Sequence, residues 1–212
     1  MFYETKKGHP FSKDPFKSLI FPRPIGWISS VSKKGIPNLA PYSYFNALAD
    51  DPPQVMFSSS APIGSNVYKD SLTNIFSTKE FVVNFVTLKT RNQMNLSSID
   101  APSNIDEFIF AKLKKRKSKL VNVPSVADSP VNLECKLLQT FNLKSNSKKN
   151  GTVVIGEVIG IFINNKFIND GRVDSAAMRY VARMGYSEYT TVSSKFKMKV
   201  PSWQNLKKKS FK

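Results

Sequence analysis

Side chains that can hydrogen-bond to oxygen atoms gather at three points of this sequence. One point is a polar run set between apolar neighbours, the second is a cluster of serines at the end of an apolar run, and the third is an expected helix start near Asp70. The residues concerned are Ser43, Tyr44, Asn46, Ser58, Ser59, Ser60, Lys69 and Ser71. A helix start with free N–H groups, a lysine and a hydroxyl suits a phosphate group that carries roughly two negative charges.

A simpler interpretation exists for each of these groups. Asp70 or Ser71 can merely cap the helix, and the pattern alone favours that interpretation. Aromatic residues at this part of the chain, such as Trp27 and Tyr42, belong to a hydrophobic core more often than they stack on a ligand ring. The residue types alone therefore leave both interpretations open.

Several kinds of catalytic site are excluded by what the sequence lacks. Neither of the usual glycine-loop motifs for nucleotides is present, and the single histidine, His9, lies in an irregular segment. One histidine and one cysteine, Cys135, are too few for a zinc site or an internal disulfide. Asp50 and Asp51 precede two prolines, a composition typical of a turn rather than of an acid-base pair. We expect no catalytic side chain and no metal site.

The chain has 212 residues and a formal net charge of +17. Its densest basic run, residues 112–119, lacks interleaved aromatic residues, so a solvated basic surface is favoured over a nucleic-acid site. A basic nucleic-acid-binding barrel remains an alternative. The chain has no long apolar run and no apolar signal segment at its start, and we therefore expect a soluble cytoplasmic protein with no membrane partner.

The hydrophobic pattern predicts an all-β protein with short helical insertions. Strands are expected over 25–31, 38–40, 54–60, 81–88, 131–141 and 152–163, and helices near 70–76, near 91–96 and after Asp174. Residues 131–141 alternate most clearly, with Cys135 facing the core and Asn132 and Glu134 facing outward. The pair Asn150-Gly151 indicates a hairpin turn into the next strand. That strand is apolar on both faces, and a second subunit is the simplest cover for its outer face.

The order of short motifs resembles the flavin reductase-like family of FMN-binding split barrels. The motifs are Arg23-Pro24-Ile25-Gly26, Asn38-Leu39-Ala40-Pro41-Tyr42-Ser43, Asp51-Pro52-Pro53, Lys69-Asp70-Ser71-Leu72, Phe81-Val82-Val83-Asn84, Ser129-Pro130-Val131-Asn132 and Arg183-Met184-Gly185 with Tyr189. No single motif is specific, but their order matches over roughly residues 20–192. The family usually has threonine where Ser71 stands, a change that keeps the hydroxyl.

The resemblance implies a split β-barrel of Greek-key type that forms a homodimer with FMN in a groove between subunits. It also implies a role for each residue of the site. The phosphate is expected at Ser58, Ser59 or Ser60 with Lys69 and Ser71, the ring at Ser43, Tyr44, Asn46 and Asn84, and closure of the site by Arg183 and Tyr189. The expected boundaries are an irregular segment over 1–22, the family domain over 23–192 and a basic tail over 193–212.

The function expected from the resemblance is hydride transfer from NADH or NADPH to flavin, by an FMN oxidoreductase. A bound flavin accepts the hydride, so the protein needs to hold the ring with one face open rather than supply an acid or base. The alternative is a flavin-binding electron carrier or sensor that does not turn over a nicotinamide.

Overall fold

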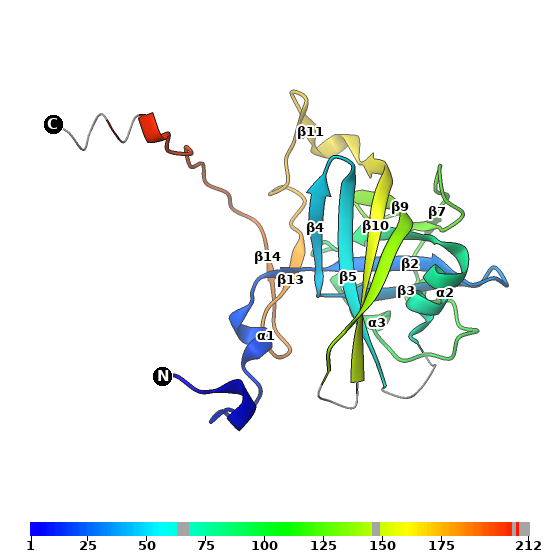
Figure 1. Cartoon of the computed structure of the whole chain (residues 1–212). Coiled ribbons are helices and arrows are strands. Elements are labelled where there is room, and N and C mark those ends of the chain that lie inside the picture. The colour runs from blue at the N-terminus through cyan, green and yellow to red at the C-terminus, as the bar shows by residue number, and fades with distance from the viewer. Residues whose placement is uncertain (63–67, 146–148, 205–206, 208–212) are drawn as a thin grey trace.

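A computed structural model describes residues 1–62, 68–145, 149–204 and 207 of the chain. It contains one large antiparallel sheet of seven strands in the order β3-β2-β6-β9-β10-β5-β4 (Figure 1). These strands are β2 (Gly26–Val31), β3 (Pro37–Tyr42), β4 (Phe45–Asp50), β5 (Pro53–Pro62), β6 (Glu80–Phe85), β9 (Val131–Leu143) and β10 (Lys149–Ile163).

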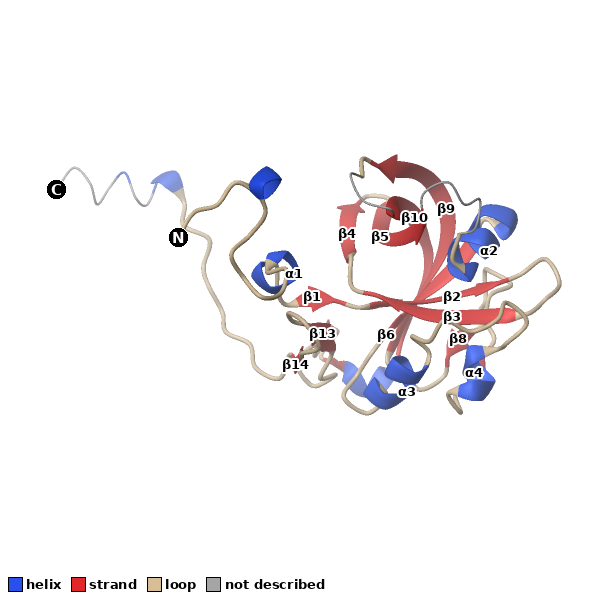
Figure 2. Ribbon diagram, turned by 90° about the horizontal axis from the view of Figure 1, so that it is seen from below, coloured by secondary structure: helices blue, strands red, loops and turns tan. Residues whose placement is uncertain are grey.

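The two edge strands of this sheet, β3 and β4, follow each other directly in the chain. Only Ser43 and Tyr44 separate them, so the sheet has to curl until its two edges approach at that turn. The curled sheet is visible in Figure 2, where β4 and β5 rise away from the plane of β2 and β3. The predicted β-dominated split barrel is confirmed.

The interior of the barrel is filled by side chains that alternate along its strands. Phe57, Phe81 and Val154 are buried there. Helix α2 (Asp70–Thr78) adds Leu72 and Ile75 to the same cluster and packs on β2 and β3. The predicted amphipathic stripe of this helix therefore covers one side of the barrel.

A second layer covers the other face of β2, β6 and β9, and it corrects one expectation. This layer contains α3 (Arg91–Leu96), α4 (Glu107–Phe110), β7 (Lys115–Arg116) and β8 (Ser125–Val126). Its core includes Trp27 and Phe108. The expected outward residues Asn132 and Glu134 are therefore buried, and Glu134 accepts hydrogen bonds from the backbone N–H groups of residues 119 and 120.

The basic run over 112–119 is partly structural. The Arg116 guanidinium lies 3.8 Å from the ring centroid of Phe162 and donates to the side-chain oxygen of Asn132 at 2.7 Å. Its burial lowers the pKa of Arg116, although the group stays protonated at neutral pH. Lys112, Lys114 and Lys117 are exposed. Arg116 thus holds the second layer against the sheet, while most lysines of this run are exposed to solvent.

Two small sheets complete the fold, and one of them replaces a predicted helix. They contain β1 (Arg23–Pro24), β13 (Val181–Arg183) and β14 (Tyr189–Thr191) in one sheet, and β11 (Ile168–Asn169) with β12 (Arg172–Val173) in the other. The helix expected after Asp174 is wrong, because Val181 donates its backbone N–H to Val86 in a strand instead. Short helical turns lie at Thr5–Lys7, Phe16–Leu19 and Asn165–Phe167.

The β9–β10 hairpin turns earlier than predicted. Gly151 lies within β10, opposite Leu143 and Ser60, so Asn150-Gly151 is not the turn. A register shift between Ile155 and Gly156 falls at the break in alternation near Leu138. No helix of the described residues has the length and apolar content that a membrane crossing requires.

Asn84 is a structural residue in this fold, contrary to its expected place beside a ring. Its side chain is 0% exposed, and its amide donates to the Trp27 carbonyl at 2.9 Å and to the Ser29 hydroxyl at 3.1 Å. Its side-chain oxygen accepts from the Val126 N–H and the Asn132 amide, both at 2.7 Å. Asn84 thus joins the barrel to the second layer.

We predict that Asn84→Ala lowers the free energy of unfolding by about 2–4 kcal/mol, because it leaves several buried partners without hydrogen bonds. Chemical denaturation measures the change. Asn104→Ala is the control, since Asn104 is exposed. Equal stability of the two variants would show that the Asn84 network contributes nothing.

Candidate functional site

A groove opens where the start of α2 faces β3. We call it the Lys69 groove, and its volume is about 640 Å³, within the usual range of small-molecule sites. The groove is lined by Asn38, Ala40, Pro41, Tyr42, Ser60, Tyr68, Lys69, Asp70, Ser71, residues 97–103 and Glu107. Lys69, Ser71 and Ser60, three of the predicted phosphate-binding residues, therefore lie in one groove.

The N-terminus of α2 opens into this groove without a side-chain cap. Lys69 is the N-cap residue, and its side chain makes no capping hydrogen bond; among the described residues no other side chain accepts one from the first turn. The predicted capping role of Asp70 or Ser71 is therefore wrong. Uncapped N–H groups and the positive end of the helix dipole make this end of α2 a suitable site for an anion.

The wall of the groove comes from alternate residues of β3. Asn38, Ala40 and Tyr42 recur at every second position, and all three line the groove. The Ser71 hydroxyl donates to the Asn38 side-chain oxygen at 2.8 Å, which joins α2 to β3. Asn38 and Tyr42 were not among the predicted site residues, and the neighbouring Pro41 also lines the groove, so strand alternation alone does not identify them.

Two buried hydroxyls, one on the groove-lining Tyr42 and one on a residue near it, lie close to each other but make no hydrogen bond of ordinary geometry among the described residues. They are the hydroxyls of Tyr42 and Ser59. Burial raises the pKa of Tyr42, an effect that the nearby Ser71 and Ser59 hydroxyls only partly oppose. The Tyr42 hydroxyl therefore stays protonated at neutral pH and is free to donate a hydrogen bond. A buried donor without a partner is costly, so these two hydroxyls indicate that the groove is built for a polar ligand.

Three acidic residues also line the groove, Asp70, Asp100 and Glu107. Burial raises the pKa of Glu107, whose carboxylate accepts a 3.0 Å hydrogen bond from the Leu39 N–H. Burial and the neighbouring Asp100 raise the pKa of Asp70, while Lys69 lowers it. Burial thus works against the charged form of both carboxyl groups.

Lys69 is held loosely in the groove. Its ammonium nitrogen lies 3.6 Å from a carboxylate oxygen of Asp100, and both side chains are substantially exposed. An exposed pair of this kind contributes little to stability. Lys69 can therefore exchange Asp100 for a ligand anion at small cost.

The structure separates the remaining predicted residues from this groove. Ser43 and Tyr44 form the β3–β4 turn, and Asn46 is an exposed residue of β4 whose side chain accepts from the Ala47 N–H. Ser58 is half-buried on β5. None of these four residues lines the Lys69 groove, and their predicted contacts with a ligand stay predictions.

Tyr189 lines a second cavity, and Arg183 lies against the Tyr189 ring. The Arg183 guanidinium lies 4.4 Å from the Tyr189 ring centroid and donates to its hydroxyl. We call this cavity the Tyr189 pocket. Its volume is about 740 Å³, and it is lined by Leu88, Arg91, Asn92, Met94, Asn95, Val181, Ser187, Tyr189, Thr190 and Thr191.

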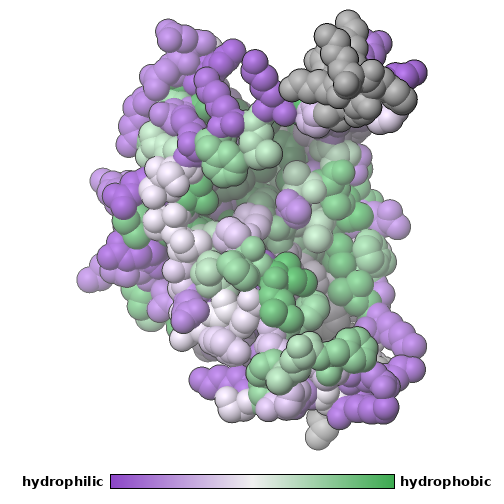
Figure 3. Space-filling view, turned by 90° about the vertical axis from the view of Figure 1, so that its left-hand side faces the viewer, coloured by the Kyte–Doolittle hydropathy of each residue, from purple (hydrophilic) through white to green (hydrophobic). Residues whose placement is uncertain are grey.

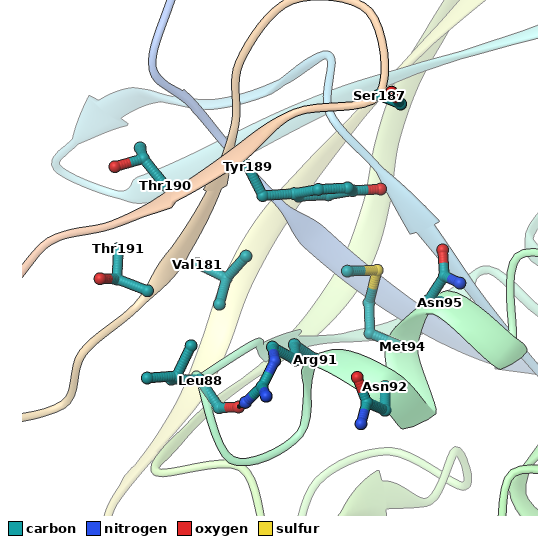
Figure 4. A pocket seen from close by; sticks show the side chains of 10 residues that line it. All are labelled: Leu88, Arg91, Asn92, Met94, Asn95, Val181, Ser187, Tyr189, Thr190 and Thr191. Atoms are coloured by element: carbon teal, nitrogen blue, oxygen red, sulfur yellow. Dashed lines mark hydrogen bonds between the residues drawn. The ribbon is translucent and has the colours of Figure 1, made fainter.

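Figure 4 shows how these side chains are arranged. The Tyr189 ring lies across one side of the pocket, and Val181, Met94 and Arg91 lie on the opposite side. Arg91 comes from α3, and the segment after α3 lines the Lys69 groove, so one short helix joins the two cavities. The hydrogen bond from the Trp27 ring N–H to the Ser97 hydroxyl, 2.8 Å long, fixes the end of α3.

Comparison with known proteins gives consistent matches over most of the chain. Residues 18–179 match the model of the flavin reductase like domain. An uncharacterized protein of Aquifex aeolicus is 34% identical over 183 residues, which cover 86% of this chain and 90% of that protein.

Two solved structures are also similar. Nitrilotriacetate monooxygenase component B from Bacillus cereus has 28% identity and a TM-score of 0.84, with 93% of this chain and 98% of that chain covered. The 2-nitrobenzoate 2-nitroreductase NbaA of Pseudomonas fluorescens has 28% identity and a TM-score of 0.77, with 89% of each chain covered.

We predict that Tyr42→Phe leaves the ligand-free protein as stable as before, or up to about 1 kcal/mol more stable, because the lost hydroxyl has no partner. Ser71→Ala is the matched comparison, since it removes a hydrogen bond to the buried Asn38, and it should cost about 1–2 kcal/mol. Unfolding in denaturant measures both. A clear loss of stability in Tyr42→Phe would mean that the hydroxyl is already satisfied.

Proposed function

Because the chain belongs to the flavin reductase-like domain family, we propose that it is an FMN-binding oxidoreductase that passes hydride from NADH or NADPH to flavin. The observation that carries this proposal is the Lys69 groove, where the unpartnered Tyr42 hydroxyl lies beside an uncapped helix N-terminus. These groups fit the phosphate end of FMN, which is anionic and accepts several hydrogen bonds.

In this proposal each residue of the groove contacts or positions a particular part of FMN. The α2 N-terminus and Lys69 supply positive charge for the phosphate, and Tyr42, Ser59 and Ser60 supply hydroxyl donors. Ser71 positions Asn38 through its hydrogen bond, which keeps β3 fixed against α2. We assign the ring end of FMN to the part of the groove that leads toward the β3–β4 turn, where Ser43 and Tyr44 lie.

The redox chemistry in this proposal belongs to FMN, which accepts a hydride when it is bound. The side chain that could otherwise react, Cys135, is fully buried, and burial raises the pKa of its thiol far above the neutral range. The contribution of the protein is therefore to bind and orient, not to supply a reactive group.

We assign the nicotinamide substrate to the Tyr189 pocket. Its aromatic wall and apolar floor suit a planar ring, and Arg91 is suited to an anionic group of the same substrate. Within the described structure the Arg91 guanidinium makes one hydrogen bond, to the Leu88 carbonyl, so most of its donors remain available. The net charge of +17 also favours the approach of anionic nucleotides.

The deciding experiment is a visible spectrum of the purified protein, taken after addition of FMN and removal of the excess. We expect retained flavin absorption that bleaches when NADH or NADPH is added without oxygen. A protein that holds no flavin would refute the proposal. A yellow protein that neither nicotinamide bleaches would instead support an electron carrier or sensor.

We predict that Lys69→Met weakens FMN binding by about 10-fold, because one charge facing the phosphate is worth about 1–2 kcal/mol in a partly exposed groove. Quenching of flavin fluorescence on titration measures the dissociation constant. Lys33→Met, which removes an exposed lysine from the β2–β3 hairpin, should leave it unchanged. Equal effects of the two substitutions would place the phosphate elsewhere.

We predict that Tyr189→Ala raises the KM for the nicotinamide by about 10-fold while FMN binding stays the same, since a stacked aromatic ring is worth roughly 1–2 kcal/mol. Tyr189→Phe, which keeps the ring, should retain most of the affinity. Steady-state kinetics and the FMN titration separate the two effects. Loss of FMN from Tyr189→Ala would mean that Tyr189 holds the cofactor instead.

A further inference from the structure

The end of the described chain is an arm that makes little contact with the rest of the protein. Figure 1 shows it leaving β14 and extending away from the barrel. We call residues 194–204 the arm. The ion pair between Lys195 and Asp174, 2.6 Å long, joins the start of the arm to the body.

The sequence of the arm alternates strictly between basic and apolar residues. Lys195, Lys197 and Lys199 alternate with Phe196, Met198 and Val200. In an extended chain the three lysines lie on one side and the three apolar residues on the other. This is the pattern of a strand with one buried face.

The apolar face of the arm lies in water in the single chain. Phe196 is 85% exposed, Met198 82%, Val200 92% and the nearby Trp203 74%. Flexible tails are poor in large apolar residues, whereas four such side chains on a short segment mark a contact with another molecule. The arm has the composition of an interface.

The large sheet has a free edge strand to which an extended segment such as the arm could pair. Strand β4 is the last strand of the large sheet, and its outer edge has no partner strand among the described residues. It is six residues long, as is the alternating part of the arm, and five of its residues are exposed. Unpaired edge strands of this kind readily accept another strand.

The charges of this edge also suit the arm. β4 exposes Leu48 and ends at Asp50, which Asp51 follows. Glu157 of β10 pairs with Gln54, at the same end of the sheet. Asp50, Asp51 and Glu157 have no ion-pair partner among the described residues, in a chain with 32 basic residues and 15 acidic ones. An apolar edge strand flanked by free carboxylates complements a strand of alternating lysines and apolar residues.

We propose that the arm of one copy adds as a strand to the free edge of β4 in a second copy, so that two copies exchange arms. An extended segment over 195–203 spans roughly 30 Å, enough to cross onto a neighbouring protein. Figure 3 shows the face from which the arm leaves, where apolar residues gather in the middle and hydrophilic ones surround them. A reciprocal exchange closes the pair, because each copy donates one arm and accepts one.

Removal of the arm tests this proposal. A chain that ends at Ser193 should fold, since the large apolar side chains of the arm are exposed and not packed on the body, and its dimer should dissociate at about 100-fold higher concentration than that of the full chain. Sedimentation equilibrium measures the dimer dissociation constant of the full chain and of the shortened chain. In the full-length chain, Phe196→Ser with Met198→Ser and Val200→Ser should have a similar effect, whereas three leucines at these positions should preserve the dimer. Unchanged dimerisation after both arm changes would overturn the proposal.

Trp203 reports where the arm lies. The chain has two tryptophans, and Trp27 is fully buried, so the difference between the full chain and Trp203→Phe isolates the arm. We expect acrylamide to quench Trp203 freely in dilute protein and poorly above the dimer dissociation constant. Quenching that is independent of concentration would overturn the proposal, whether Trp203 is always exposed or is covered by its own chain.

A charge exchange tests the acceptor strand. Asp50→Lys should weaken the dimer by about 10-fold, and Lys197→Glu in the same chain should restore much of the loss. Glu4→Lys is the matched control, because it makes the same charge change in the exposed N-terminal segment. If Asp50→Lys has no greater effect than Glu4→Lys, the arm does not bind at β4.

Discussion

The structure is organised by the requirement that a buried polar group have a hydrogen-bond partner. Asn84, Asn132 and Glu134 meet this requirement within the protein, and their bonds join the barrel to the layer that covers it. The hydroxyls of Tyr42 and Ser59 make no hydrogen bond of ordinary geometry within the described part of the chain. This difference separates polar residues that hold the fold from polar residues that await a ligand, although all of them look alike in the sequence.

The strong positive charge of the chain can be explained without a nucleic-acid partner. Its lysines lie mostly on the surface, and the arginine of the basic run is used to fix the second layer on Phe162. At the Lys69 groove the favourable features for an anion are local ones, a helix N-terminus and one loosely paired lysine. Burial raises the pKa values of two of the carboxyl groups that line this groove, those of Asp70 and Glu107.

Groups without a partner are found at the surface of the barrel as well as at the groove. Among the described residues, the outer edge of β4 has no neighbouring strand for its backbone hydrogen bonds, and the apolar side chains of the arm are exposed to water. A small ligand suits the groove, while an extended strand suits the edge. The search for groups without a partner therefore leads to two proposals, a small ligand for the Lys69 groove and a second copy of the chain for the edge of β4.

The sequence by itself determined most strands of the barrel and the stripe of α2, because hydrophobic period and helix-start chemistry act over a few residues. The expectation that a serine of 58–60 lies with Lys69 and Ser71 came from the family resemblance, not from these local patterns. It did not determine which polar side chains are enclosed. Asn84 was expected beside a ligand and Glu134 in water, yet both are buried by the layer over 91–126. Tyr42 was expected in the core, and it is buried, but it also lines the groove, and its buried hydroxyl makes no hydrogen bond of ordinary geometry among the described residues. Only the tertiary structure decided these cases, because burial and hydrogen bonding depend on segments that lie far apart in the chain.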